Sequence, residues 1–134
     1  MKKEQLKRIF EFIEEKEKHK APFIWKLEND IPLREEDLNI EGNLYLRDSE
    51  ITSLPKGLKV GGWLDLSRSK IKSLPEGLKV GCDLNLTYKE ITSLPEGLEV
   101  GGILYLYKSA LVEYTDEELR EMVKPGFIQG KIYR

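Results

Sequence analysis

The chain has 134 residues, enough for one domain with one core. Charged residues make up 34% of it, but the two signs nearly cancel to a formal net charge of -2, so there is no basic block of the kind that binds nucleic acid. The single cysteine excludes an intrachain disulfide, and no uninterrupted apolar stretch follows the basic first residues as in a signal peptide or a membrane span. We therefore expect a cytoplasmic protein without a membrane partner.

The first element expected is a helix that runs to about Lys18. Leu6, Ile9, Phe10 and Ile13 recur at the spacing i, i+3, i+4, i+7, which gives a helix one apolar stripe. The stripe needs a surface to cover, so residues 1–33 are interpreted as an N-terminal helical cap on the segment that follows.

That segment, residues 34–113, is repetitive. The phrase SLPEGLKVGG recurs in close variants that start at Ser53, Ser73 and Ser93, an interval of twenty residues each time, and a weaker copy precedes them. The apolar skeleton of that weaker copy, which the next three units repeat, consists of Leu38, Ile40, Leu44, Leu46 and Ile51. Because each unit can bury its apolar face only against its neighbours, four such units predict a solenoid.

Two short strands are expected in each unit. Leu64 and Leu66 alternate with polar residues and should point inward, and Leu58 and Val60 alternate in the same way. A pair of small residues lies between the strands, where glycine would permit a positive φ or a close backbone approach. Each position of the pair holds one non-glycine, Glu41 and Cys82, which favours small size over positive φ as the requirement.

This pattern resembles the leucine-rich repeat family, in the short-period bacterial and phage-type form in which LPxGL marks the boundary between units. The resemblance covers residues 34–113 and implies a solenoid whose outward strand positions form one sheet face, the usual binding surface of the family. The chain departs from the family at the usual asparagine ladder, whose positions hold Ser49, Ser69, Lys89 and Ser109. The turns after the strands are therefore expected to differ from those of the family.

A second helix is expected after the repeats. Thr115 followed by Glu118 is a capping box that opens a helix to about Val123, and Pro125-Gly126 ends it. Residues 114–134 are thus interpreted as a C-terminal cap. The fold class is α+β: a short leucine-rich-repeat-like solenoid of four 20-residue turns, mostly β with irregular connections, capped by an N-terminal and a C-terminal helix in a single domain of residues 1–134.

Catalytic chemistry finds little support in the sequence. The only histidine, His19, ends the first expected helix, where an exposed position is the simpler interpretation. Cys82 replaces a glycine inside a repeat, which favours a small buried thiol over a nucleophile. One histidine and one cysteine far apart give no metal-ligand spacing, and VGG matches no phosphate-binding loop. We expect no enzyme, no cofactor and no metal site.

The outward strand positions are the candidate binding surface. They vary between units while the apolar skeleton does not, so they are free to specialise. The residues expected to bind a partner are Tyr45, Trp63, Asp65, Asp83, Tyr88, Ile103, Tyr105 and Tyr107. Two other interpretations stay open: aromatic residues suit strands in any case, or the C-terminal GFIQGKIYR segment folds over them.

Tyrosine and tryptophan supply much of the anchor energy of protein interfaces. The expected function is therefore non-catalytic binding of a protein partner, by analogy that of a bacterial or phage-encoded inhibitor of a host protein. The Asp65 and Asp83 carboxylates favour basic groups on that partner. One alternative is a structural module that forms homo-oligomers through strand edges or the tyrosines. The other is nucleic-acid binding through Lys16, Lys18, Lys20 and Lys26, against which the interleaved glutamates argue.

Overall fold

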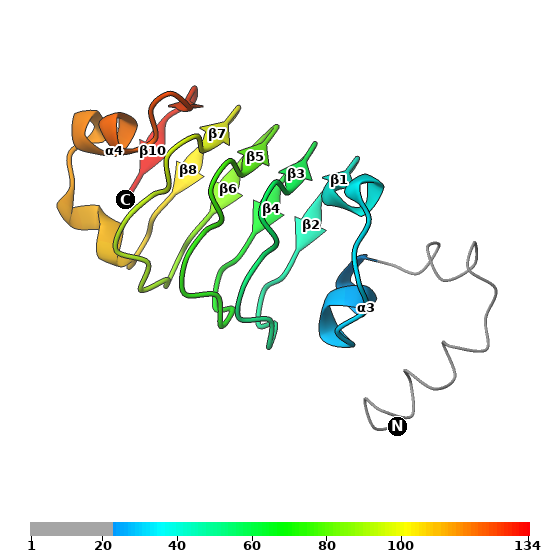
Figure 1. The fold of residues 1–134 in the computed structure, drawn as a ribbon. Helices are drawn as coiled ribbons and strands as arrows, with labels where there is room; N and C mark the ends of the chain where they lie inside the picture. The colour runs from blue at the N-terminus through cyan, green and yellow to red at the C-terminus, as the bar shows by residue number, and fades with distance from the viewer. Residues whose placement is uncertain (1–22) are drawn as a thin grey trace, which may run out of the picture. The chain divides into compact units, whose positions relative to one another are not determined.

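The computed structural model describes residues 23–134 (Figure 1). The chain divides into two compact units, Met1–Asp37 and Leu38–Arg134. The helix expected through Lys18 lies outside the described residues, and the expectation of a single domain over the whole chain stays a prediction.

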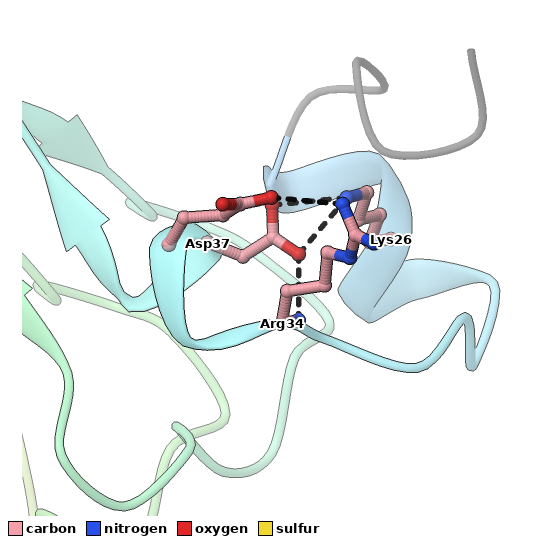
Figure 2. A network of polar contacts seen from close by, with 4 residues as sticks. Lys26, Arg34 and Asp37 are labelled. Carbon is pink, nitrogen blue, oxygen red and sulfur yellow. Dashed lines mark hydrogen bonds and ion pairs between the residues drawn. The ribbon is translucent and has the colours of Figure 1, made fainter. Parts of the chain in front are cut away.

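The described part of the first unit is organised around a buried ion pair. The helix α3 (Phe23–Glu28) carries Lys26, whose side chain is fully buried and whose Nζ lies 2.9 Å from both carboxylate oxygens of Asp37 (Figure 2). Asp37 belongs to the short 3-10 helix η1 (Glu35–Leu38) and also accepts from the backbone N–H of Arg34 at 2.8 Å. A buried charge is costly unless it is paired, so removal of either the carboxylate or the ammonium would destabilise this unit.

The second unit is a β-solenoid of stacked parallel strands, which confirms the prediction of a repeat solenoid. In Figure 1 its strands form two rows, one for each sheet. Sheet A contains β1 (Asn39–Ile40), β3 (Lys59–Val60), β5 (Lys79–Val80), β7 (Glu99–Val100) and β9 (Phe127–Ile128). Sheet B contains β2 (Leu44–Tyr45), β4 (Leu64–Asp65), β6 (Leu84–Asn85), β8 (Leu104–Tyr105) and β10 (Ile132–Tyr133).

The core lies between the two sheets and is built from the same position of each repeat. Leu44 pairs with Leu64, Leu64 with Leu84 and Leu84 with Leu104, so these side chains stack in register. The leucines that are completely shielded from solvent are Leu58, Leu64, Leu66, Leu78, Leu84, Leu86, Leu98, Leu104, Leu106 and Leu111, together with Leu119 of the C-terminal segment. The apolar skeleton of the three later units is thus the core of the solenoid, whereas Leu38, Ile40 and Ile51 of the first copy are half-buried.

The small-residue pair forms a corner where consecutive turns touch. A Cβ on Gly81 would overlap the carbonyl oxygen of Gly61, and a Cβ on Gly101 would overlap that of Gly81. None of these three glycines has a positive φ, so the corner requires small size, as the sequence indicated. Positive φ occurs instead in the LPxGL phrase, at the glycines Gly57, Gly77 and Gly97.

Strands β2, β4 and β8 of sheet B each lead into a tight turn that a serine stabilises. In the first such turn, the backbone N–H of Ser49 donates to the carbonyl of Leu46, and Asp48, one of the two residues between them, adopts a φ of 59°. The Ser49 hydroxyl then accepts from the N–H of Ile51. The hydroxyls of Ser69 and Ser109 likewise accept from the backbone N–H two residues later in the chain. Serine at the ladder position therefore supplies an acceptor for a backbone N–H group.

The C-terminal segment combines the expected helix with two further strands. Helix α4 (Asp116–Met122) begins after Thr115, and the capping box is complete, because Thr115 and Glu118 each accept from the backbone N–H of the other. The 3-10 helix η2 (Ala110–Glu113) precedes it. Strand β9 then extends sheet A and strand β10 extends sheet B, although the repeated phrase does not continue into this segment.

Arg120 of helix α4 closes the exposed edge of sheet A. In this stack the backbone N–H of Gly101 donates to Val80, that of Gln129 to Val100 and that of Gly130 to Gly102. A further turn would donate in the same way to the carbonyls of Ile128 and Gly130. Arg120 supplies these two bonds instead, from Nε to Ile128 at 3.3 Å and from a terminal guanidinium nitrogen to Gly130 at 2.9 Å.

The stacked leucines provide a test of the core. Leu64→Ala and Leu84→Ala each remove a fully buried side chain, so each should lower the free energy of unfolding by about 2–5 kcal/mol. Urea unfolding measures the loss, with Lys59→Ala at an exposed strand position as the control. Unchanged midpoints for both leucine variants would contradict the register.

The Arg120 contacts provide a second test. In Arg120→Ala the carbonyls of Ile128 and Gly130 lose their donors, and an unpaired strand edge favours pairing with another chain. We expect the variant to associate as concentration rises, measured by sedimentation velocity. Lys124→Ala, which removes an exposed charge near the same helix end, should behave like the wild type. An equally monodisperse Arg120→Ala would show that the edge is protected by other means.

Candidate functional site

A hollow of about 290 Å³ opens on the outward face of sheet B. We call it the sheet B hollow, and its side chains come from Tyr45, Trp63, Asp65, Asp83, Asn85 and Tyr105. Five of these six residues were predicted to bind a partner, and the structure brings them together. Asn85 was not among the predicted residues.

The floor of the hollow is formed by two short polar side chains that fold back and accept hydrogen bonds from the backbone. Asp65 Oδ1 accepts from the N–H of Ser67 at 3.0 Å and from its hydroxyl at 2.6 Å. In the next turn Asn85 Oδ1 accepts from the N–H of Thr87 at 2.9 Å. Tyrosines occupy the same register position on the flanking strands, as Tyr45 and Tyr105. Large rings therefore lie at both ends of this ladder and short side chains lie between them.

The neighbouring ladder alternates between hydrogen-bond acceptors and apolar side chains. Asn43 Oδ1 accepts from the backbone N–H of Trp63, and Asp83 Oδ1 accepts from that of Ile103, both at 2.8 Å. Asn43 also donates from Nδ2 to the Tyr45 hydroxyl at 2.9 Å, which orients that ring. Asp83 thus supports the stack and lines the hollow at once.

Two rings of the sheet B hollow are exposed, Tyr45 and Trp63, with 55% and 51% of their surface accessible. Tyr105 is half-buried because Tyr133 of strand β10 stacks on it, with ring centroids 5.8 Å apart and an 18° interplanar angle. Ile103 is half-buried as well. The C-terminal segment therefore covers one flank of Tyr105 and adds its own exposed tyrosine to the face.

Tyr88 and Tyr107 belong to a second group on the turns after sheet B, which we call the loop cluster. The guanidinium of Arg68 lies 5.2 Å from the centre of the Tyr88 ring. Lys108 Nζ lies 5.7 Å from that centre and 5.4 Å from the centre of the Tyr107 ring. The two rings meet edge to face at 5.9 Å. Their partners within the chain hold these tyrosines in the loop cluster, whereas Tyr105 is paired with Tyr133.

Lys89, which the sequence places at the ladder position but not among the candidate site residues, is a buried ionisable group. Its Nζ donates to the carbonyl of Ser69. In the flanking units that carbonyl position accepts a backbone N–H instead, from Lys70 to Ser49 and from Ala110 to Lys89. Burial lowers the pKa of Lys89 from its usual 10.5, and Glu90 partly opposes the shift. The Lys89 ammonium thus takes the place of a backbone N–H donor. A nucleophilic role for Lys89 has no support beyond its lowered pKa.

A second hollow, of about 630 Å³, lies beside Lys89. Lys70 and Lys72 also line it, but Lys70 is paired with Glu50 and Glu90 stands at the rim. This mixture of signs gives the larger hollow no single ligand chemistry.

Two absences concern residues 23–134, the part of the chain that the structure describes. Within that range no three or more His, Cys, Asp and Glu side chains are grouped to hold a metal ion. None of its helices is long and apolar enough to cross a membrane. Cys82 is half-buried, with its Sγ 3.8 Å from the carbonyl oxygen of Gly61.

Comparison with protein-family models, with curated proteins and with solved structures gives no match.

The Lys89 contact predicts a stability change with a definite pH dependence. Lys89→Ser should stabilise the protein by about 1 kcal/mol, because the hydroxyl can accept from the N–H of Ile91 as its counterparts do. With its pKa lowered in the folded state, wild-type Lys89 holds fewer protons folded than unfolded, so wild-type stability rises with pH toward 10.5. The advantage of Lys89→Ser should therefore narrow as pH rises.

Urea unfolding at pH 7 and about pH 10 measures both effects. Lys72→Ser, at an exposed position, is the matched control and should show the same small difference at both values. An advantage of Lys89→Ser that widens with pH would contradict the assigned direction of the shift.

Proposed function

We propose that the protein is a non-catalytic module that binds another protein through the outward face of sheet B. The observation that carries the proposal is the sheet B hollow, which has exposed rings at its rim and two carboxylates inside. Rigid aromatic rings around a depression are typical of interface anchors, because they bury much apolar area at small cost in side-chain entropy.

The finer expectations from the sequence belong to the same proposal. The leucine-rich repeat resemblance supports a 20-residue stacking unit, four of which form the solenoid, with helical segments as caps at its ends. It also supports the sheet face as the binding surface. A cytoplasmic inhibitor of a host protein, encoded by a bacterium or a phage, is the role that this analogy favours.

The structure weakens the two alternative functions, nucleic-acid binding and self-association, because residues that each would use are already engaged within the chain. For nucleic-acid binding, Lys26 was one of four proposed contacts, but its ammonium is fully buried against Asp37. The other three lysines lie outside the described residues. For self-association through strand edges, Arg120 already occupies the carbonyls of Ile128 and Gly130 at the β9 edge of sheet A. The face of sheet B, with its exposed tyrosines, is a further route by which two copies could pair.

A photo-crosslinking amino acid at position 63 tests the proposal. In a lysate of the organism that encodes the chain, this position should link to one protein, because Trp63 stands at the rim of the hollow with 51% of its surface exposed. The same amino acid at position 79, exposed on sheet A, is the control. Equal crosslinking from both positions, or crosslinks only to a second copy of this chain, would overturn the assignment.

With the crosslinked protein purified, single substitutions measure the anchors. Trp63→Ala and Tyr45→Ala should each weaken binding by about 2 kcal/mol or more. Folding should change little, since neither ring lies in the core. Isothermal titration calorimetry measures the affinity, and Lys79→Ala should leave it unchanged. Wild-type affinity in both aromatic variants would remove the sheet B face from the interface.

A further inference from the structure

The sheet B hollow contains two negative charges that the folding of its backbone does not require. Asp65 and Asp83 both line it, and each commits its Oδ1 to a backbone N–H. No ion pair within residues 23–134 involves either carboxylate, in contrast to Asp37 and Asp116, which are paired with basic side chains. Two unneutralised carboxylates therefore lie together in one depression.

The chain itself shows that a neutral amide would serve the fold equally well. Asn85 makes the contact of Asp65 one turn further along, with its Oδ1 accepting from a backbone N–H two residues on. Asn43 makes the contact of Asp83 two turns earlier, with the same 2.8 Å distance to the backbone of the following turn. Since asparagine supplies these acceptors in the equivalent positions, the charge of both aspartates is available for binding.

The rings around these carboxylates favour a cation of a particular shape. Tyr45 and Trp63 are exposed and Tyr105 closes the other end of the hollow. Aromatic faces attract cations, and a planar guanidinium can stack on a ring while it donates in a fork to a carboxylate. The loop cluster gives an example within this chain, where the guanidinium of Arg68 lies 5.2 Å from the centre of the Tyr88 ring.

The size of the hollow limits the occupant to one side chain. Its volume of about 290 Å³ lies just below the range of roughly 300–1,000 Å³ that is common for small-molecule pockets. We propose that the sheet B hollow accepts a single arginine side chain of the partner protein, between the rings of Trp63 and Tyr105 and against the carboxylates of Asp65 and Asp83. This inference rests on the proposed function and deepens it.

A short peptide tests the chemistry without the partner. The probe is acetyl-Gly-Gly-Arg-Gly-Gly-amide, titrated to about 20 mM into the full-length ¹⁵N-labelled chain, which suffices for a millimolar dissociation constant. The indole N–H of Trp63, identified by its loss in Trp63→Phe, and the side-chain amide of Asn85 should shift in a saturable manner. The peptide with citrulline, a neutral analogue of arginine, should bind at least about tenfold more weakly. Equal shifts from both peptides, or none from either, would overturn the proposal.

Because asparagine occurs at the equivalent positions of other turns, aspartate-to-asparagine substitutions test the charge of the hollow without loss of the backbone contacts. Asp65→Asn with Asp83→Asn should weaken arginine-peptide binding by about tenfold or more while the urea midpoint stays unchanged, because the backbone acceptors remain. The control, Asp48→Asn with Glu76→Gln, removes two exposed negative charges outside the hollow and should bind like the wild type. Equal weakening in both double variants would reveal only long-range attraction and refute the site.

The two proposals fail in different ways. If Trp63→Ala weakens the crosslinked partner but the aspartate-to-asparagine double variant binds that partner normally, the face is the interface and the arginine assignment is wrong. If the arginine peptide binds the hollow as expected while crosslinks form elsewhere on the chain, the cation site stands and the proposed interface is wrong.

Discussion

The solenoid depends on direct backbone contact between consecutive turns at the corner that joins its two sheets. Any Cβ on Gly81 or Gly101 would overlap a carbonyl oxygen of the turn before, so the spacing there is set by the peptide groups themselves. That spacing keeps both sheets in one register and places each side chain beside its counterpart in the next turn. The leucine core and the outward ladders, including the sheet B hollow, are both consequences of it.

Most of this architecture could be predicted because the apolar residues that form the core recur at regular intervals in the sequence. Leu64 and Leu84 occupy equivalent positions, and only a stack buries both. Strands β9 and β10 escaped prediction because helix α4 lengthens the connection before them and removes the repeated phrase. The pairing of Tyr105 with Tyr133 escaped with them. The site residues were found through their outward positions, but which rings share a hollow depends on tertiary contacts that no spacing reveals.

The outward ladders show how a repeat can vary its surface without cost to its backbone. Asp65 and Asn85 satisfy the same kind of N–H group, as do Asp83 and Asn43. The oxygen that supports the turn is common to both residue types, and only the charge differs. Exchange between them therefore changes the electrostatic character of the face while the stack stays intact. Specificity for a charged partner can be gained or lost at such positions independently of stability.

The guanidinium of Arg120 has a consequence for how arrays of this type change in length. Because it holds the carbonyls that a following turn would use, any unit added beyond helix α4 would meet an occupied ladder. A unit duplicated between Ser53 and Ser93 would instead find matching neighbours on both sides and would leave the terminating residue in place. Longer or shorter relatives of this fold should therefore arise by insertion or excision in the interior of the array, with the arginine-bearing helix retained as a constant terminal module.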